Sequence, residues 1–116
     1  MHHYNLTSLD NMRAYCNAIA KEIHGSHSIV RTTVHAGGKA TAFVENNVPE
    51  PRGYIESPSY GTSEMRALKQ LAQRMESRMQ FFFGETALLI FRKIFLQTGR
   101  APTTADREAE KHTVQS

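Results

Sequence analysis

Histidine, cysteine and carboxylate side chains are the residues of this chain that could do chemistry, so their spacing comes first. His24 and His27 lie three positions apart, and Cys16 precedes His24 by eight. Zinc sites use these residue types, but a structural site needs a second pair at ligand spacing. No second pair of that kind follows. We therefore interpret the two histidines as polar residues where a helix ends, and we expect no metal and no cofactor.

Catalytic motifs are missing from the sequence. It contains no Gly-x-Ser-x-Gly, no Gly-x-x-x-x-Gly-Lys and no His-Glu-x-x-His. The acidic residues Glu45, Glu50 and Glu56 are scattered over expected strands and loop, whereas acid–base catalysis needs carboxylates that converge. The sequence thus predicts a protein that is not an enzyme and has no catalytic residues.

Basic side chains offer a second kind of chemistry, the neutralisation of phosphates. Residues 61–100 carry seven basic and three acidic groups, while residues 1–60 are balanced at five of each. The candidates for contact with nucleic acid are Lys39, Arg66, Lys69, Arg74 and Arg78. Their alternative interpretation is the ordinary solvated face of an amphipathic helix, and the stripe lacks the interleaved aromatic residues of a single-strand platform.

The segment 81–96 is the most unusual one, because its apolar residues cover nearly the whole circumference of a helix. A helix that is apolar all round must be buried all round. Two interpretations stay open: a central core helix, or a helix that lies partly in an interface. The candidate residues for partner binding or self-association are Phe81, Phe82, Phe83, Leu89, Ile90 and Phe95.

Length and composition set the frame for these groups. A chain of 116 residues is one domain by size, and we expect that domain at 1–99 with a disordered tail at 100–116, where apolar residues nearly vanish. The single Cys16 excludes an intramolecular disulfide and fits a reducing compartment. No secretory signal or membrane-spanning run is visible, so we expect a cytoplasmic protein that does not enter a membrane.

The elements that must position these residues begin with a helix and a hairpin. Apolar residues at spacings of three and four predict a helix over 8–24, with Thr7 and Asp10 at capping-box spacing and Gly25 as its stop. Two runs rich in β-branched residues, 28–36 and 39–45, flank Gly37 and Gly38 and predict an antiparallel hairpin. Its buried face stays undecided.

The second half of the chain is predicted to be helical. Residues 46–58 contain three of the four prolines and are expected as loop, with a short third strand within 53–57 at a sheet edge. Helices follow over 63–80 and 85–98, capped by Thr62 or Ser63 and stopped by Gly99. Whether Gly84 kinks one long helix or separates two stays open. The fold class is therefore α+β.

The order of helix, hairpin, third strand and helix resembles the double-stranded-RNA-binding domain, an αβββα fold. Gly61, Ser63 and Ala67 match that family's helix start, Gly-x-Ser-Lys-Lys-x-Ala-Lys. The family's three phosphate-binding lysines fall on Glu64, Met65 and Leu68, which are not basic, and its Gly-Pro-x-His hairpin loop is absent. The resemblance implies a similar architecture without the residues that bind RNA in the family.

These observations favour binding over catalysis. The first hypothesis is a non-enzymatic protein-binding module, an inhibitor or accessory factor of the phage or mobile-element type that acts by steric blocking; its partner is a protein of unknown identity or a second copy in a homodimer. The alternative is a nucleic-acid-binding protein that uses the basic helix stripe.

Overall fold

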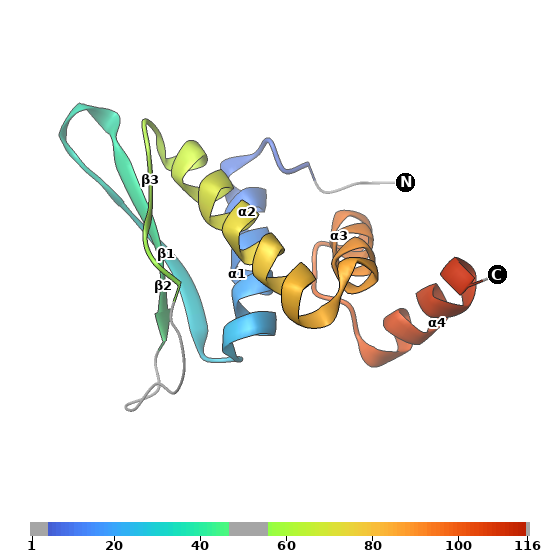
Figure 1. Ribbon diagram of the computed structural model, residues 1–116. Coiled ribbons are helices and arrows are strands. Elements are labelled where there is room, and N and C mark those ends of the chain that lie inside the picture. The colour runs from blue at the N-terminus through green and yellow to red at the C-terminus, as the bar shows by residue number, and fades with distance from the viewer. Residues whose placement is uncertain (1–4, 47–55, 116) are drawn as a thin grey trace.

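A three-stranded antiparallel sheet lies at one end of the molecule and is covered on one face by helices (Figure 1). The computed structural model describes residues 5–46 and 56–115, with side chains for residues 5–46 and 56–110. The elements in chain order are α1 (Leu9–His24), β1 (Ser28–Val34), a 3₁₀ turn η1 (Ala36–Gly38), β2 (Ala40–Asn46), β3 (Ser59–Gly61), α2 (Glu64–Phe83), α3 (Glu85–Thr98) and α4 (Thr104–Gln115). The expected α+β class is confirmed.

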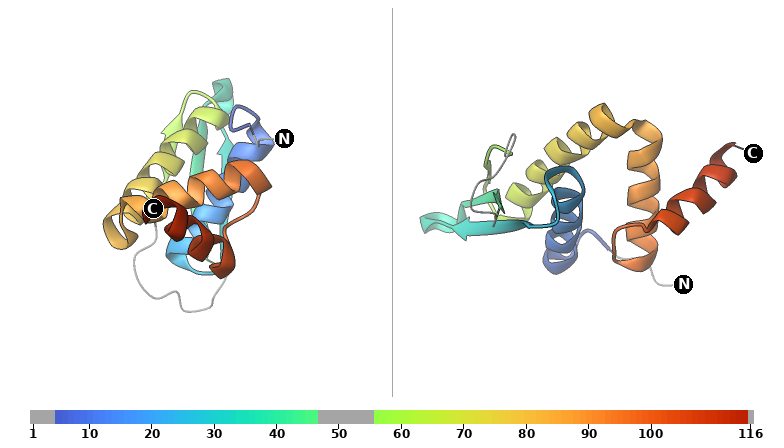
Figure 2. Two further views of the ribbon diagram at one scale, coloured as in Figure 1. Left: turned by 90° about the vertical axis from the view of Figure 1, so that its right-hand side faces the viewer. Right: turned by 90° about the horizontal axis from the view of Figure 1, so that it is seen from below.

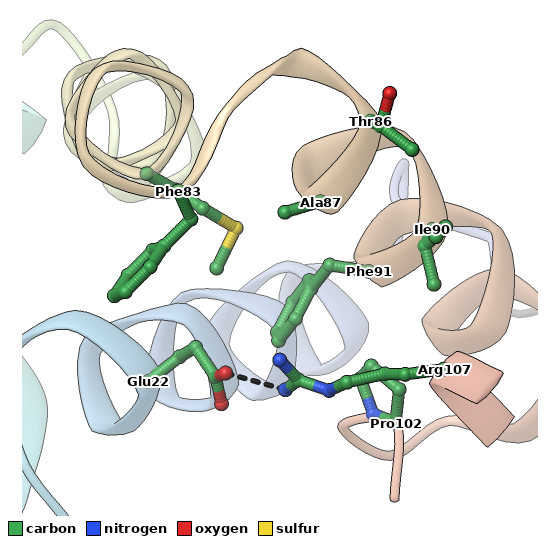
Figure 3. A pocket seen from close by; sticks show the side chains of 9 residues that line it. Glu22, Phe83, Thr86, Ala87, Ile90, Phe91, Pro102 and Arg107 are labelled. Carbon is green, nitrogen blue, oxygen red and sulfur yellow. Dashed lines mark hydrogen bonds and ion pairs between the residues drawn. The ribbon is translucent and has the colours of Figure 1, made fainter. Parts of the chain in front are cut away.

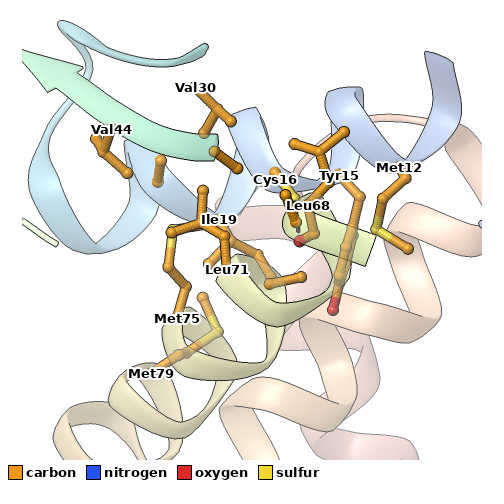
Figure 4. Packing of buried hydrophobic residues seen from close by; sticks show 14 of the residues in the cluster. Met12, Tyr15, Cys16, Ile19, Val30, Val44, Leu68, Leu71, Met75 and Met79 are labelled. Atoms are coloured by element: carbon orange, nitrogen blue, oxygen red, sulfur yellow. Dashed lines mark hydrogen bonds between the residues drawn. The ribbon is translucent and has the colours of Figure 1, made fainter. Parts of the chain in front are cut away.

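Helices α1 and α2 pack side by side on the sheet, and the core lies between these two layers (Figure 4). The apolar stripe of α1 predicted from its spacing supplies Tyr15, Cys16 and Ile19, all fully buried. The core-facing residues of α2 are Ala67, Leu68, Leu71, Ala72, Met75 and Met79. Burial of these side chains is the main stabilising term, at about 1.5–3 kcal/mol for each large apolar residue.

Helix α3 extends the same core beyond the sheet. Its Leu88, Phe91 and Phe95 join the buried cluster. The Tyr15 ring meets Phe95 at 5.2 Å, edge on, and its hydroxyl donates a 2.6 Å hydrogen bond to the Glu76 carboxylate. Because the tyrosine has a polar partner, its burial leaves no orphan hydroxyl.

The register of the hairpin decides which face is buried. Val30 pairs with Val44, and Val34 pairs with Ala40. Val30, Ala42 and Val44 point into the core, which decides the buried face that the sequence pattern left open. Gly37 and Gly38 at the turn both have a positive φ, as expected for a two-glycine connection.

The third strand lies downstream of its predicted position. Residues 53–55 of the predicted segment lie outside the described residues, and Glu56 and Ser57 are not in a strand. Strand β3 instead follows Pro58 and pairs with β2 through Ala42↔Ser59 and Ala40↔Gly61. Its place at a sheet edge agrees with the prediction. Ahead of this strand, the Glu56 carboxylate points into the molecule and makes ion pairs with His24 and Arg78.

Two helices, and not one kinked helix, follow β3. Gly84 has φ +96°, a conformation that favours glycine, and it ends α2 and begins α3. The expected cap at Ser63 is confirmed, since its Oγ accepts from the Arg66 N–H at 3.2 Å. At α1 the cap is Ser8 rather than Thr7, whose hydroxyl bonds to Asn5.

The expectation of a disordered tail at 100–116 is wrong for most of that segment, which contains α4 (Figure 2). Thr103 and Asp106 cap each other reciprocally: the Asp106 N–H donates to Thr103 Oγ1, and the Thr103 N–H donates to Asp106 Oδ2. Lys93 of α3 pairs with Glu110 at 2.8 Å, and Arg107 pairs with Glu22 of α1. These polar contacts dock the helix, so a search for apolar residues overlooks it.

Candidate binding surfaces

Three consecutive phenylalanines are exposed to solvent at the end of α2, just before α3 begins. Phe81, Phe82 and Phe83 are 82%, 62% and 56% exposed. The rings of Phe81 and Phe82 meet edge to face at 5.3 Å. Leu89, on the first turns of α3, is 56% exposed. We call these four residues the aromatic elbow.

Ile90 and Phe95 do not share this exposure. They are 5% and 1% exposed, so the chain itself covers these two of the six residues assigned to partner binding. Each of the two interpretations of segment 81–96 therefore applies to a different part of it. Most of the large apolar side chains of α3 are buried, whereas the phenylalanines before it are exposed.

A pocket opens beside the elbow, between α1, α3 and the start of α4 (Figure 3). Its volume is about 300 Å³. The walls are mainly apolar and are lined by Glu22, Met79, Phe83, Thr86, Ala87, Ile90, Phe91, Pro102 and Arg107. The ion pair between Glu22 and Arg107 crosses one side of it (Figure 3). We call this cavity the elbow pocket.

Two of the five candidate nucleic-acid residues, Arg74 and Arg78, form ion pairs and hydrogen bonds with other groups of the chain. Arg78 Nε donates to Glu56 Oε2 at 2.8 Å, and Arg74 lies 3.8 Å from the same carboxylate. Arg74 also donates to the carbonyl oxygens of Ser57 and Pro58 at 3.0 and 3.2 Å. His24 Nε2 completes the cluster at 3.2 Å from Glu56 Oε2. We call these four side chains the Glu56 clasp.

The electrostatics of the clasp follow from burial. The Glu56 side chain is 1% exposed. Burial alone would raise the pKa of its carboxyl, but hydrogen bonds from Arg78 and His24, together with their charges, outweigh that effect and lower the pKa. Glu56 therefore stays ionised, and its ion pairs join the residues just before β3 to His24 of α1 and Arg78 of α2.

The other three candidates, Lys39, Arg66 and Lys69, face solvent and have no ion-pair partner among the described residues. Lys39 and Arg66 line an open groove of about 500 Å³ between the hairpin end, β3 and the first turns of α2. Lys69 lines an adjoining hollow together with Arg66. We call these two depressions the basic groove.

The groups first considered for metal chemistry lie apart. His24 belongs to the Glu56 clasp, and the Cys16 thiol is buried 3.4 Å from the Leu68 carbonyl oxygen. Burial raises the pKa of the Cys16 thiol to about 12, so the thiol is protonated and unreactive. Within residues 5–46 and 56–110, no three His, Cys, Asp or Glu side chains gather as a metal site would require.

Two residues of these surfaces escaped the sequence reasoning. Glu56 was one of three scattered acids, yet it is the buried centre of a cluster. Tyr60 is 66% exposed and lines the basic groove, although it precedes α2 and lies outside the basic stripe. The proline on each side of Glu56, at 51 and 58, was the nearest signal of a constrained segment.

Comparison with known proteins adds no name to these surfaces: no model of a protein family, no curated protein and no solved structure matches the chain. In the part of the chain that the structure describes, none of the helices combines the length and apolar character needed to cross a bilayer. The element order up to the second helix is α1-β1-β2-β3-α2, and the resemblance to the double-stranded-RNA-binding domain stays a prediction.

Proposed function

We propose that this protein is a non-enzymatic protein-binding module that docks through the aromatic elbow. The observation that carries the proposal is the exposure of three consecutive phenylalanines on an ordered helix end. Phenylalanine loses about 1.5–3 kcal/mol of burial energy when it stands in water. Side chains of this kind are enriched in the cores of protein interfaces.

The size of the elbow supports this role. Together the three phenylalanines expose the equivalent of about two whole side chains, roughly 300–500 Å² of apolar surface. That is the scale of the largest apolar patch on a typical monomer, about 300–600 Å², and such patches are often functional. A stable interface buries about 800 Å² per partner, so the elbow fits the core of an interface whose rim is polar.

The surroundings of the elbow describe the partner. Arg92 of α3 and Arg107 of α4 are already paired within the chain, with Glu76 and Glu22. A partner therefore needs an apolar groove for the phenylalanines and one apolar side chain for the elbow pocket. A second copy of this chain offers both features, so homodimerisation is the first association to measure.

The pairing of the acidic residues supports a binding role over catalysis. Glu45 pairs with Arg31, Glu64 with Arg13, and Glu56 with Arg78. Carboxylates held in such pairs stabilise structure and are poorly placed to shuttle protons. The module would then act as an inhibitor or accessory factor of the phage or mobile-element type, by steric blocking in the cytoplasm, where the unpaired Cys16 stays reduced.

A double substitution tests the proposal. We expect Phe81→Ser/Phe82→Ser to abolish association, whether with a second copy, measured by sedimentation, or with a protein captured from the native host. Val34→Ser is the matched control, because Val34 is 58% exposed on the hairpin, away from the elbow. It should retain the association.

Two outcomes would contradict the proposal. One is a double variant that associates as strongly as wild type. The other is a wild-type protein that stays monomeric at high concentration and captures no partner. The mass of the complex separates a homodimer from a complex with another protein.

A further inference from the structure

The basic groove is lined by the first turns of α2, whereas the aromatic elbow lies where that helix ends. Figure 1 shows the two ends of α2. Helix α2 has 20 residues and is therefore about 30 Å long. A ligand in the groove would not touch the elbow phenylalanines. The groove thus needs an explanation of its own.

Charge is the first property of this surface. Its lining residues are His35, Lys39, Ala40, Thr41, Tyr60, Gly61, Thr62, Arg66, Gln70, and, in the adjoining hollow, Lys69 and Gln73. None of them is acidic. The nearest carboxylate of the helix, Glu64, is bound to Arg13 and Thr32. Lys39, Arg66 and Lys69 thus form a local excess of positive charge, which attracts a polyanion.

Hydrogen-bonding groups stand between these cations. The hydroxyls of Thr41 and Thr62 and the amides of Gln70 and Gln73 line the same surface. The His35 ring is held by a 2.8 Å hydrogen bond between its Nε2 and Thr41 Oγ1. Hydroxyl and amide groups, with arginine and lysine, are the usual partners of phosphate oxygens and sugars.

An exposed aromatic ring is the second property. Tyr60, on the edge strand β3, is 66% exposed and lines the groove beside Arg66. A base can stack on such a ring only when it is free of a duplex, and stacking is worth about 1–3 kcal/mol per base. The sequence separated Tyr60 from the basic residues, whereas pairing of β3 with β2 brings it next to them.

We infer that the basic groove binds single-stranded nucleic acid. Lys39, Arg66 and Lys69 neutralise its phosphates, and Tyr60 stacks on an unpaired base. Arg74 and Arg78, which the sequence grouped with these cations, take no part because they hold Glu56. The αβββα resemblance does not supply this surface, since its lysine positions carry Glu64, Met65 and Leu68.

The experiment measures fluorescence anisotropy of labelled oligo-deoxythymidine and oligo-uridine, with a duplex of equal length as a third probe. Three phosphate contacts on a single strand give a slope of log affinity against log salt of about −2, roughly 0.7 per contact. Lys39→Gln, Arg66→Gln and Lys69→Gln should each weaken binding and reduce that slope by about 0.7. Lys93→Gln removes an equal charge on α3 and should change neither.

Tyr60 gives the second readout. Tyr60→Ala should weaken binding roughly 5- to 100-fold, the range expected from loss of one stacked base. Tyr60→Phe should restore it, because the ring is kept. Neither change should alter the salt slope, since no charge is lost.

Three results would overturn the inference. The first is no binding of either single strand at about 50 mM salt, where phosphate contacts are strong. The second is binding that the three cation variants leave unchanged. The third is a duplex that binds as tightly as the single strands, with Tyr60→Ala as good as wild type. Phe81→Ser/Phe82→Ser should bind nucleic acid normally, so a failure here is distinguishable from a failure of the proposed protein docking.

Discussion

The two halves of helix α2 carry basic side chains on one continuous polar face, yet these side chains differ in their environment. Arg66 and Lys69, in the first half, point into solvent at the basic groove. Arg74 and Arg78, in the second half, hold the buried carboxylate of Glu56. A stripe of charge that looks uniform in the sequence therefore contains one half available for ligands and one half that builds the fold.

Position relative to one distant acid makes the difference. Glu56 lies 22 residues before Arg78 in the sequence, and its side chain contacts the second half of α2 through Arg78 and Arg74. Leaving a buried charge without its partner costs about 3–5 kcal/mol, whereas an exposed charge costs little to remove. The same residue type thus contributes very different amounts to stability at the two places.

Of the substitutions that test this difference, removal of Arg78 should change the stability of the protein most. We expect Arg78→Ala to lower the free energy of unfolding by about 3 kcal/mol, because Glu56 loses its closest cation. Lys69→Ala should change it by less than about 0.5 kcal/mol. Urea unfolding at neutral pH measures both. Equal losses in the two variants would show that the halves of α2 do not differ in this way.

A close approach between backbones, besides the ion pair of Glu64 with Arg13, holds the first half of α2 in place. A Cβ atom added at Gly61 would lie 2.5 Å from the Ala67 backbone nitrogen and 2.9 Å from the Arg66 carbonyl carbon. This approach also explains why small residues stand at positions 61 and 67. The glycine at position 61, which matches the helix start of the double-stranded-RNA-binding domain, is therefore explained by packing and is no evidence of RNA binding.

Substitution of Gly61 tests the first half of α2, and we expect an intermediate loss of stability. We expect Gly61→Ala to destabilise the protein by about 1–3 kcal/mol, since backbone must shift to admit the methyl group. The control is Thr62→Ala, an exposed neighbour on the same loop. Thermal melts followed by circular dichroism would reveal the difference, and a Gly61→Ala variant as stable as Thr62→Ala would remove the argument.

Much of the fold was predictable from local pattern, because local pattern determines it. The spacing of Leu9, Met12, Cys16 and Ile19 indicated α1, and the two β-branched runs around Gly37 and Gly38 indicated the hairpin. These elements bury one regular face, and that regularity is written in the residue order.

The remainder depends on contacts between distant residues. Helix α4 docks through Arg107 on Glu22 and Glu110 on Lys93, and Glu56, just before β3, is paired with Arg78. None of these pairs leaves a periodic trace in the sequence. The candidate sites were hard to predict for the same reason. Phe82 is exposed and Phe95 is buried, although the sequence placed both in one apolar segment, and the pairing of β3 with β2 brings Tyr60 to the groove.

Acid should weaken the contacts that join Glu56 to the second half of α2. The pKa of Glu56 is lowered in the folded protein by its hydrogen bonds to Arg78 and His24, which outweigh burial. A carboxyl with a lowered folded pKa stabilises the protein at any pH above its unfolded value, about 4.3 for Glu. That stabilisation is lost as the pH falls from there through the folded pKa.

Glu56→Gln isolates this contribution and should have the smallest effect of the three. The amide keeps the shape but weakens charge-assisted hydrogen bonds, so we expect a loss of about 1 kcal/mol at pH 7. As the pH falls below the unfolded pKa of about 4.3, the stabilities of the variant and wild type should approach each other, and they should converge once the pH is below the folded pKa of Glu56. Arg66→Gln and Lys69→Gln should follow the wild-type pH profile, since neither cation contacts Glu56. Unfolding curves recorded from pH 7 into the acid range provide the measurement, and a gap between Glu56→Gln and wild type that stays constant at all pH values would mean that the charge on Glu56 does not distinguish the two halves of α2.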